Sequence, residues 1–497
     1  MFKNFPGYKL LEKIQKSNSH KRERKLPLNA IKLIFIVAIT SVIALLPTES
    51  FGIEGLTVVH QRIISLFVFA ALMWLTEAMP SWVTSMIVVT IMLLTVSTSA
   101  FNFLRPEDGA GLVPFKSIMA CFANPTIMLF IGGFVLAIGL TKVKLDVALA
   151  RVLLKPFGTR SEIVLLGFIL VTAIFSAFVS NTATAAMMLA FLTPVLKSLP
   201  ADGKGRIALA LAIPVGANLG GMMTPIGTPP NMIALDYLSS QGMGISFVDW
   251  TIKMAPFVIV LLLLSWLLLR VLFPFKQKHI KIEIEGEIKW NRHTWSVVAA
   301  FAITIFMWMF GTDLWGVDTN VVAMIPIAIF CATGILTRRD LEEINWSVLW
   351  MVAGGFALGV ALNYKDASSV SLSSLIVNTV PFDNFSPLVV MILAGVICFG
   401  FSNFISHSAA TSLLVPVLGV VAGGLGSSLD SFGGPQAMLV GIAIASSVSM
   451  ILPISTPPNA IAHSTGFIEQ KDMMKVGIII GLMGLALGYA MLIFIGF

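Results

Sequence analysis

The chain has 497 residues, of which 57% are hydrophobic and only 11% are charged. Soluble domains carry about 25% charged residues, so the composition excludes an ordinary soluble protein and predicts an all-α polytopic membrane protein. The net charge of +7 does not indicate nucleic-acid binding, because the basic residues gather in a few short loops, as the positive-inside rule expects.

The first spans follow a polar leader. Residues 1–29 are rich in Lys and Arg just before the first apolar run and are expected to stay cytoplasmic. At about 20 residues per crossing, the sequence predicts transmembrane helices at 30–47, 61–79, 81–98 and 118–141.

The next apolar stretch, 163–196, is too long for one crossing and is interrupted by Ser-Asn-Thr at 180–182. Basic residues flank it on both sides, so we expect a re-entrant hairpin, residues 161–198, that enters from the cytoplasm. A broken span within 207–235 is interrupted by Gly-Thr-Pro-Pro-Asn at 227–231. A sixth span, 252–273, leads into a charged segment that is also expected to be cytoplasmic.

The second half is predicted to contain spans at 295–311, 320–336 and 347–363. A second hairpin, 387–421, has no Lys or Arg on either flank and is expected to enter from outside. A broken span, 436–462, and a last span, 476–496, complete the chain. The total is eleven crossings and two hairpins in the cell membrane, with a cytoplasmic N-terminus and an extracellular C-terminus.

Three sequence blocks recur in the same order at closely preserved spacing, which indicates an internal repeat. An odd number of crossings separates the copies, so the repeat is inverted, as in many secondary transporters. The paired blocks are Gly-Gly-Phe at 132–134 and 354–356, Ser-Asn-Thr at 180–182 and Ser-His-Ser at 406–408, and Thr-Pro-Pro-Asn at 228–231 and 456–459.

These blocks carry chemistry because a helix that restarts inside a membrane presents unpaired N–H groups with partial positive charge, which suit a carboxylate. Ser180 is a natural N-cap, and Thr228 and Thr456, each before a proline, are expected at helix breaks. The backbone carbonyl groups of the unwound segments could instead coordinate Na⁺. Each motif alone could equally be a surface cap or a kink, but duplication in register favours the functional interpretation.

The pattern resembles the divalent anion/sodium symporter family, through Trp-Leu-Thr-Glu-Ala-Met-Pro at 74–80 and the duplicated blocks. The resemblance implies transport of di- and tricarboxylates by a homodimer in which a mobile transport domain moves like an elevator against a scaffold. It implies no catalysis, and no cofactor other than a possible Na⁺. The domain organisation that we expect from this resemblance has scaffold helices at 30–116 and 294–345 and transport-domain segments at 117–251 and 346–475. A sixth span with its connector occupies 252–293, and a last helix occupies 476–497.

Carried over by position, the resemblance implies which residues bind. The first Na⁺ site would use Ser176, Ser180, Asn181 and Gly227, and the second Ser402, Ile405, His407 and Ser455. The expected substrate contacts are Ser180, Asn181, Thr182, Thr228, Pro229, Ser406, His407, Ser408, Thr456 and Pro457.

The sequence departs from the family pattern at His407, where the symporters have asparagine, and at Ser408, which replaces threonine. A protonated imidazole would repel Na⁺ and could itself supply the positive charge. We therefore expect membership of the Na⁺-independent exchanger branch, with C4/C5 dicarboxylates such as succinate, malate, fumarate or 2-oxoglutarate as substrates. The alternative is a neutral His407 beside a working Na⁺ site, and hence a Na⁺-coupled symporter.

Two other classes fit less well. An intramembrane enzyme would need a nucleophile–base pair or a metal-binding set such as His-Glu-x-x-His, and neither is present. An anion channel could also use helix N-termini, but an inverted repeat within one subunit favours a carrier.

Overall fold

The computed structural model describes residues 26–497 apart from 108, 201–202, 281–289, 367–369 and 381–384. Most of the predicted leader and part of the predicted connector therefore lie outside the described residues. Within the described part, every element longer than an isolated β-bridge is a helix. Nine of the described helices are long and apolar enough to cross a membrane, which makes the chain a multi-pass helical membrane protein.

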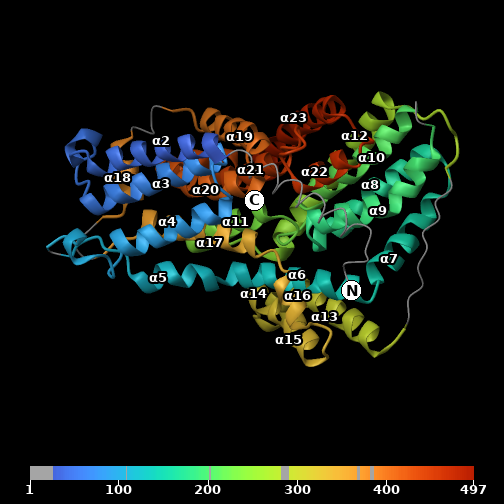
Figure 1. Ribbon diagram of the computed structural model, residues 1–497, viewed down its shortest axis with the longest axis horizontal. Coiled ribbons are helices and arrows are strands. Elements are labelled where there is room, and N and C mark those ends of the chain that lie inside the picture. Colours follow the sequence, from blue (N-terminus) through green and yellow to red (C-terminus); the bar gives the residue numbers. More distant parts are fainter. Residues whose placement is uncertain (1–25, 108, 201–202, 281–289, 367–369, 381–384) are drawn as a thin grey trace.

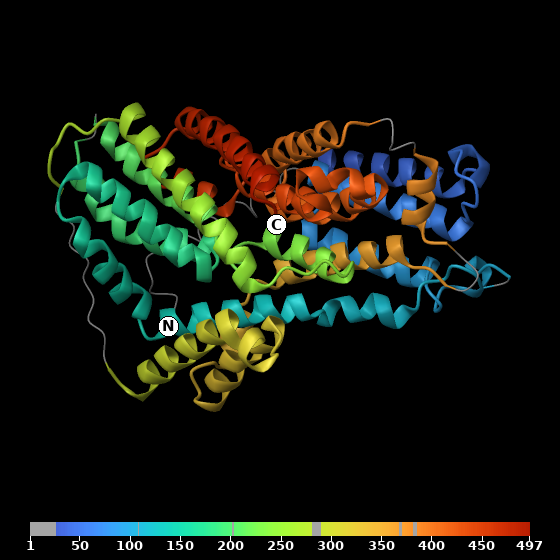
Figure 2. The ribbon, with the colours of Figure 1, turned by 180° about the vertical axis from the view of Figure 1, so that it is seen from behind.

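The first half follows the predicted spans with shifts of a few residues at the ends. The predicted span 118–141 is a longer row, Phe115–Lys142, with a short 3-10 turn in its middle. Figures 1 and 2 both show α5 and α6 end to end in this row. The helices are α2 Leu26–Leu45, α3 Val58–Thr76, α4 Ser81–Thr95, α5 Phe115–Ala120, α6 Pro125–Lys142, α7 Leu145–Leu154, α8 Ser161–Phe178, α9 Asn181–Ser198, α10 Lys204–Gly220, α11 Pro229–Ser240 and α12 Phe247–Leu272.

The second half repeats much of this order. Its elements include short connecting helices, α16 and α18, that the hydropathy pattern did not indicate. The helices are α13 Arg292–Trp315, α14 Thr319–Val322, α15 Met324–Ala332, α16 Arg338–Glu342, α17 Trp346–Asn363, α18 Leu372–Thr379, α19 Pro387–Phe404, α20 His407–Leu425, α21 Gly434–Ser447, α22 Pro457–Ser464 and α23 Gln470–Phe494.

Two pairs of helices meet at tight tips, and two further pairs are separated by longer non-helical breaks. Only residues 179–180 separate α8 from α9, and only 405–406 separate α19 from α20. The breaks lie between α10 and α11, at 221–228, and between α21 and α22, at 448–456. The tips and breaks coincide with the polar blocks, so the helix ends are where the sequence places its hydroxyl and amide groups.

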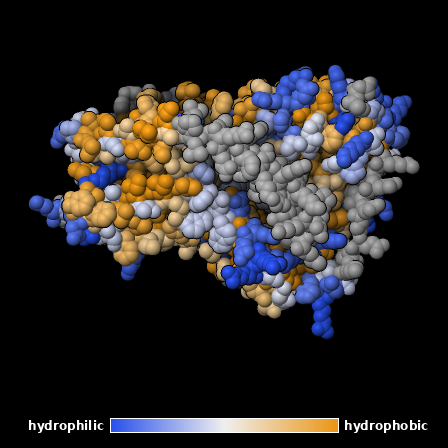
Figure 3. All heavy atoms as spheres, in the orientation of Figure 1, coloured by the Kyte–Doolittle hydropathy of each residue, from blue (hydrophilic) through white to orange (hydrophobic). Residues whose placement is uncertain are grey.

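Much of the outer surface is apolar, as expected for a protein that faces lipid. Leu45 is 84% exposed, Val271 74% and Ile34 69%, and Figure 3 shows broad hydrophobic areas on the face that it presents. Exposed aliphatic side chains of this kind are costly in water and suit a hydrocarbon environment. The exposed surface therefore agrees with the membrane assignment that helix length and hydropathy give.

The two Gly-Gly pairs allow close helix contact. A Cβ at Gly132 on α6 would lie 2.5 Å from the carbonyl oxygen of Ala323, and a Cβ at Gly354 on α17 would lie 2.4 Å from the Cβ of Ser85. Small residues at such crossings let transmembrane helices pack backbone to backbone. Helix α6 is thus fixed against the α14–α15 segment, and α17 against α4.

This packing predicts a difference between two adjacent glycines. Gly132→Ala should destabilise the protein by about 2 kcal/mol, because the new methyl group meets backbone that has little room to move. Gly133→Ala is the matched control, since nothing lies within 4 Å of a Cβ built there. Thermal unfolding in detergent would measure both, and equal melting temperatures for the two variants would contradict the packing account.

Candidate functional site

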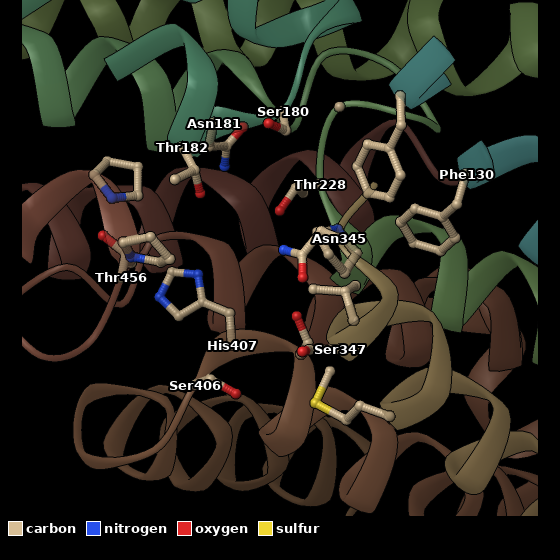
Figure 4. A pocket seen from close by; sticks show the side chains of 18 of the residues that line it. Phe130, Ser180, Asn181, Thr182, Thr228, Asn345, Ser347, Ser406, His407 and Thr456 are labelled. Carbon is tan, nitrogen blue, oxygen red and sulfur yellow. The ribbon is translucent and has the colours of Figure 1, made fainter. Parts of the chain in front are cut away.

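Both tips and both breaks meet around one cavity of about 330 Å³. Figure 4 shows Ser180, Asn181 and Thr182 on one side of the cavity, with Ser406 and His407 opposite them. Every residue that the sequence predicted as a substrate contact lines this cavity, although their binding role stays a prediction. These residues are Ser180, Asn181, Thr182, Thr228, Pro229, Ser406, His407, Ser408, Thr456 and Pro457.

Four helices begin at this cavity: α9, α11, α20 and α22. The hydroxyl groups of three N-cap residues accept backbone hydrogen bonds: Ser180 from the N–H of Ala183 and Ser406 from that of Ala409, both at 3.3 Å, and Thr456 from that of Asn459 at 3.2 Å. The fourth N-cap, Thr228, makes no such bond. The positive ends of four helix dipoles therefore converge on one space, which suits an anion.

Among the described residues, the cavity wall contains no Asp, Glu, Lys or Arg, and His407 is its only histidine. Recognition of an anion here would depend on helix dipoles, hydroxyls and amides rather than on a fixed ion pair. No metal-binding group of three or more His, Cys, Asp or Glu side chains occurs among the described residues.

The asparagines that end the Thr-Pro-Pro-Asn blocks hold the helix breaks in place. Asn231 Nδ2 donates to the carbonyl oxygens of Gly221 at 3.0 Å and Thr224 at 2.8 Å. Asn459 Nδ2 donates in the same way to Met450 at 2.9 Å and Leu452 at 3.0 Å. Backbone carbonyls that lost their helical partners are thus satisfied. The asparagine is duplicated in the sequence, at 231 and 459, and this duplication could have predicted its structural role at the breaks.

The first predicted Na⁺ site lies directly behind the first tip. Ser176 is fully buried, and its hydroxyl donates to the carbonyl of Ala217 at 2.7 Å. The side-chain amide of Asn181 faces Ser176 Oγ, the Ala217 carbonyl and the Gly227 carbonyl. With its nitrogen toward them it donates at 2.6, 3.3 and 3.0 Å.

The orientation of the Asn181 amide decides what this group of oxygens can hold. With the amide nitrogen inward, the oxygens are satisfied without an ion. With the amide oxygen inward, they form an all-oxygen set of the kind that a hard cation prefers. The residues present therefore fit a Na⁺ ion, which would be held by Ser176, Asn181 and Gly227 and would add positive charge beside the anion cavity.

The second predicted Na⁺ site has a different composition. His407 Nε2 lies 2.6 Å from the carbonyl oxygen of Ser449, and since a carbonyl can only accept, Nε2 carries the hydrogen. The other predicted ligands are buried and bond elsewhere: Ser402 Oγ to Ser446 Oγ at 3.2 Å, and Ser455 Oγ to the Leu452 carbonyl at 2.7 Å. The imidazole N–H is thus bonded to the carbonyl of Ser449, which was not one of the predicted ligands, and the second Na⁺ site stays a prediction.

Several residues that line the cavity were not predicted from the sequence. They come from the N-cap and first turn of α4, from α6 and from the start of α17, in segments that the hydropathy pattern predicted only as transmembrane spans. The block at 74–80 was noted as a family pattern, but no local signal placed its end at the site. These residues are Pro80, Ser81, Trp82, Phe130, Phe134, Asn345 and Ser347.

A second cavity of about 210 Å³ adjoins the first and shares Phe134, Ser180 and Asn345 with it. Its wall includes Asp146 on α7 and Glu343 between α16 and α17. Burial raises the pKa of the Asp146 carboxyl to about 6, so this group is partly protonated near neutral pH. Its wall residues Thr141 and Asp146 flank Lys142 and Lys144 in the sequence, and Glu343 follows α16, which begins with Arg338 and Arg339.

Comparisons with known proteins agree with the geometry. The family described as the sodium:sulfate symporter transmembrane region matches residues 28–496. An uncharacterized transporter of Haemophilus influenzae is 31% identical over 91% of this chain and 94% of its own length. The sodium-dependent dicarboxylate transporter SdcS of Staphylococcus saprophyticus is 28% identical over 85% of this chain and 83% of its own.

Another relative and a solved structure extend the comparison. The inorganic phosphate transporter PHO87 of Saccharomyces cerevisiae is 28% identical over 90% of this chain and 47% of its own length. The fold is similar to that of the Alcanivorax borkumensis YdaH transporter, with a TM-score of 0.53 at 12% identity over 86% of this chain and 97% of that one. The chain therefore belongs to the sodium:sulfate symporter family, the divalent anion/sodium symporters whose motifs it carries.

Proposed function

We propose that the protein is a secondary transporter of C4 and C5 dicarboxylates that works as a Na⁺-independent exchanger. The observation that carries this proposal is the convergence of four helix N-termini on an uncharged cavity. Two opposed tips with hydroxyl and amide groups suit an anion with two separated carboxylates better than a single-centre oxyanion. The name of the staphylococcal relative supports the same substrate class.

The proposal includes an inverted repeat, eleven crossings and elevator movement. Tips and breaks occur in matched order in both halves, and each Gly-Gly helix packs on an equivalent partner: α6 on the α14–α15 segment and α17 on α4. These contacts support placing α6 and α17 in the scaffold. The transport-domain segments would then begin after Lys142 and after Asn363 rather than at 117 and 346.

The remaining parts of the proposal follow from the family resemblance and the charge pattern. We place the protein in the cell membrane as a homodimer, with the N-terminus in the cytoplasm and the C-terminus outside. Lys142, Lys144, Arg338 and Arg339 would then lie at the cytoplasmic side, and the second cavity would open to the cytoplasm. The conformation is accordingly the inward-facing one.

Exchange is proposed because of His407. Figure 4 shows the ring nitrogen that does not face Ser449 turned toward the cavity and Thr182. Protonation makes this nitrogen a donor and gives the ring a positive charge, which a dianion neutralises. Without substrate, burial in a low-dielectric site favours the neutral ring, so the proposal of exchange rests on the Nε2–H donor of His407 at a position where a cation ligand was expected. The second candidate, Na⁺-coupled symport, is supported by the oxygen set around Asn181.

Substitution of Asn181 tests the anion site. Asn181→Ala should weaken succinate binding about tenfold, as expected for the loss of a hydrogen bond to a charged group. Asn181→Asp should weaken binding more, because a carboxylate at the start of α9 repels the substrate. Calorimetric titration would measure both against the exposed control Asn102→Asp. Equal affinity in Asn181→Asp and wild type would contradict the site.

Labelled succinate uptake into proteoliposomes tests the exchange mechanism. We expect uptake to require internal succinate and to be independent of a Na⁺ gradient, because the Asn181 nitrogen satisfies the oxygens at the first tip without an ion and an imidazole replaces the amide at the second. Strong Na⁺-driven uptake into empty vesicles would contradict exchange and favour the symporter. Phosphate that competes better than succinate would contradict the substrate class.

The same assay tests His407. His407→Asn should gain Na⁺ dependence, because an amide can turn its oxygen toward the Ser449 carbonyl and complete an oxygen set with a cation. His463→Asn on α22, which does not line the cavity, is the matched control. Unchanged Na⁺ independence in active His407→Asn protein would remove His407 from the coupling mechanism.

A further inference from the structure

Asn218, near the end of α10, joins the first half of the chain to the second break. It is buried and lines the cavity. Its side-chain Nδ2 donates to Asn459 Oδ1 at 3.0 Å and to Thr456 Oγ1 at 3.2 Å. An amide nitrogen carries two hydrogens, so both bonds form at once. Asn218 therefore binds the N-cap and the third residue of α22 from a helix of the other half.

The backbone carbonyls of the second break fix the orientation of both amides. Asn459 Nδ2 donates to the carbonyl oxygens of Met450 and Leu452, at 2.9 and 3.0 Å. A carbonyl only accepts, so the nitrogen of Asn459 faces these two groups and its oxygen faces Asn218. That oxygen needs a donor, so Asn218 presents its nitrogen in turn. The direction of each bond thus follows from the two break carbonyls.

The hydroxyl of Thr456 is the last group in this chain of hydrogen bonds. Its oxygen accepts from Asn218 Nδ2 and from the backbone N–H of Asn459, both at 3.2 Å. A hydroxyl has two acceptor positions and one hydrogen, so both acceptor positions are occupied. No acceptor among the described residues takes the hydrogen. Because Thr456 lines the cavity (Figure 4), the hydrogen is available to a molecule bound there.

The first break lacks this arrangement. Asn218 and Ser446 each lie ten residues before the threonine of their Thr-Pro-Pro-Asn block, which makes them equivalent in the repeat. The Ser446 hydroxyl donates to the carbonyl of His407 at 2.9 Å. Asn231 Oδ1 is left buried without a hydrogen-bond partner among the described residues, and Thr228 makes no cap bond. The hydroxyl direction is therefore fixed at the second break and not at the first.

We propose that Asn218 is a positioning residue for substrate binding, which holds the Thr456 hydroxyl as a hydrogen-bond donor to a carboxylate of the substrate. The inference rests on the proposed function and deepens it, because it assigns a fixed donor to one break only. An ionised carboxylate has acceptors and no hydrogen, so it suits a hydroxyl whose acceptor positions are already occupied. A donor that is oriented before binding also avoids the entropic cost of ordering it.

Because Asn218 acts through Thr456, its loss should matter only while the hydroxyl is present. Calorimetric titration of the purified protein with succinate measures this. We expect Thr456→Val to weaken binding about tenfold and Asn218→Ala about fivefold, as for a hydrogen bond to a charged group that is lost or left unaligned. The double variant should bind about tenfold more weakly than wild type, whereas independent contacts would give about fiftyfold.

Two variants separate positioning from general support of the break. Thr456→Ser keeps the hydroxyl and should retain wild-type affinity. Asn403→Ala is the matched control, because Asn403 supports the same break without lining the cavity. Its Oδ1 accepts from the N–H of Ile451 at 2.9 Å, and its Nδ2 donates to the Phe399 carbonyl at 2.7 Å. Asn403→Ala should lower the melting temperature in detergent and leave succinate affinity unchanged.

Several results would overturn the inference while wild-type protein still binds succinate. They are unchanged affinity in folded Asn218→Ala, a fiftyfold loss in the double variant, and an affinity loss in Asn403→Ala that equals that of Asn218→Ala. If Asn218→Ala does not fold, equal affinities of Thr456→Ser and Thr456→Val would overturn it. Wild-type protein that binds no succinate would contradict the proposed function as well, which is a separate outcome.

Discussion

A helix that is broken inside a membrane leaves backbone N–H and C=O groups without partners, and each such group costs several kcal/mol in hydrocarbon. The rest of this structure depends on how that constraint is met. The carbonyl side is satisfied internally, because Asn231 and Asn459 each bridge carbonyl oxygens across a break. The N–H side is directed into a shared cavity, where a solute with negative charge can satisfy it. The anion site and the stability of the broken helices are therefore two consequences of one arrangement.

The two halves meet this constraint in the same way but differ where a cation would bind. At the first tip, the amide of Asn181 can present either nitrogen or oxygen to the surrounding oxygens. At the second tip, the ring of His407 presents a donor to the Ser449 carbonyl. A fixed donor in one half and an amide that can present either of its groups in the other make the two tips chemically different. The two tips are therefore alike in their helix starts and unlike in the side chains at positions 181 and 407.

The sequence predicted the tips and breaks because polar blocks inside apolar runs are costly and these blocks are duplicated in register. All the residues that it predicted as substrate contacts line one cavity in the structure. It did not predict Asn345, Ser347 or the segment at 80–82, because each lies at the edge of an ordinary apolar span. Only the packing of α17 on α4, through Gly354 and Ser85, brings these residues to the tips. The hydrogen bond that Thr126 Oγ1 on α6 donates to Asp236 Oδ1 on α11, at 2.8 Å, is equally non-local, and so left no pattern in the sequence.

The central claim is that an anion binds between the two hairpin tips by means of helix N-termini and without a charged lysine or arginine. A cryo-electron microscopy map of the protein in lipid nanodiscs with succinate tests this most directly. The account predicts density for the ligand in contact with Asn181, Thr182 and the residues at 406–408. Ligand density outside this cavity, or a substrate carboxylate paired with an arginine or lysine side chain, would contradict it.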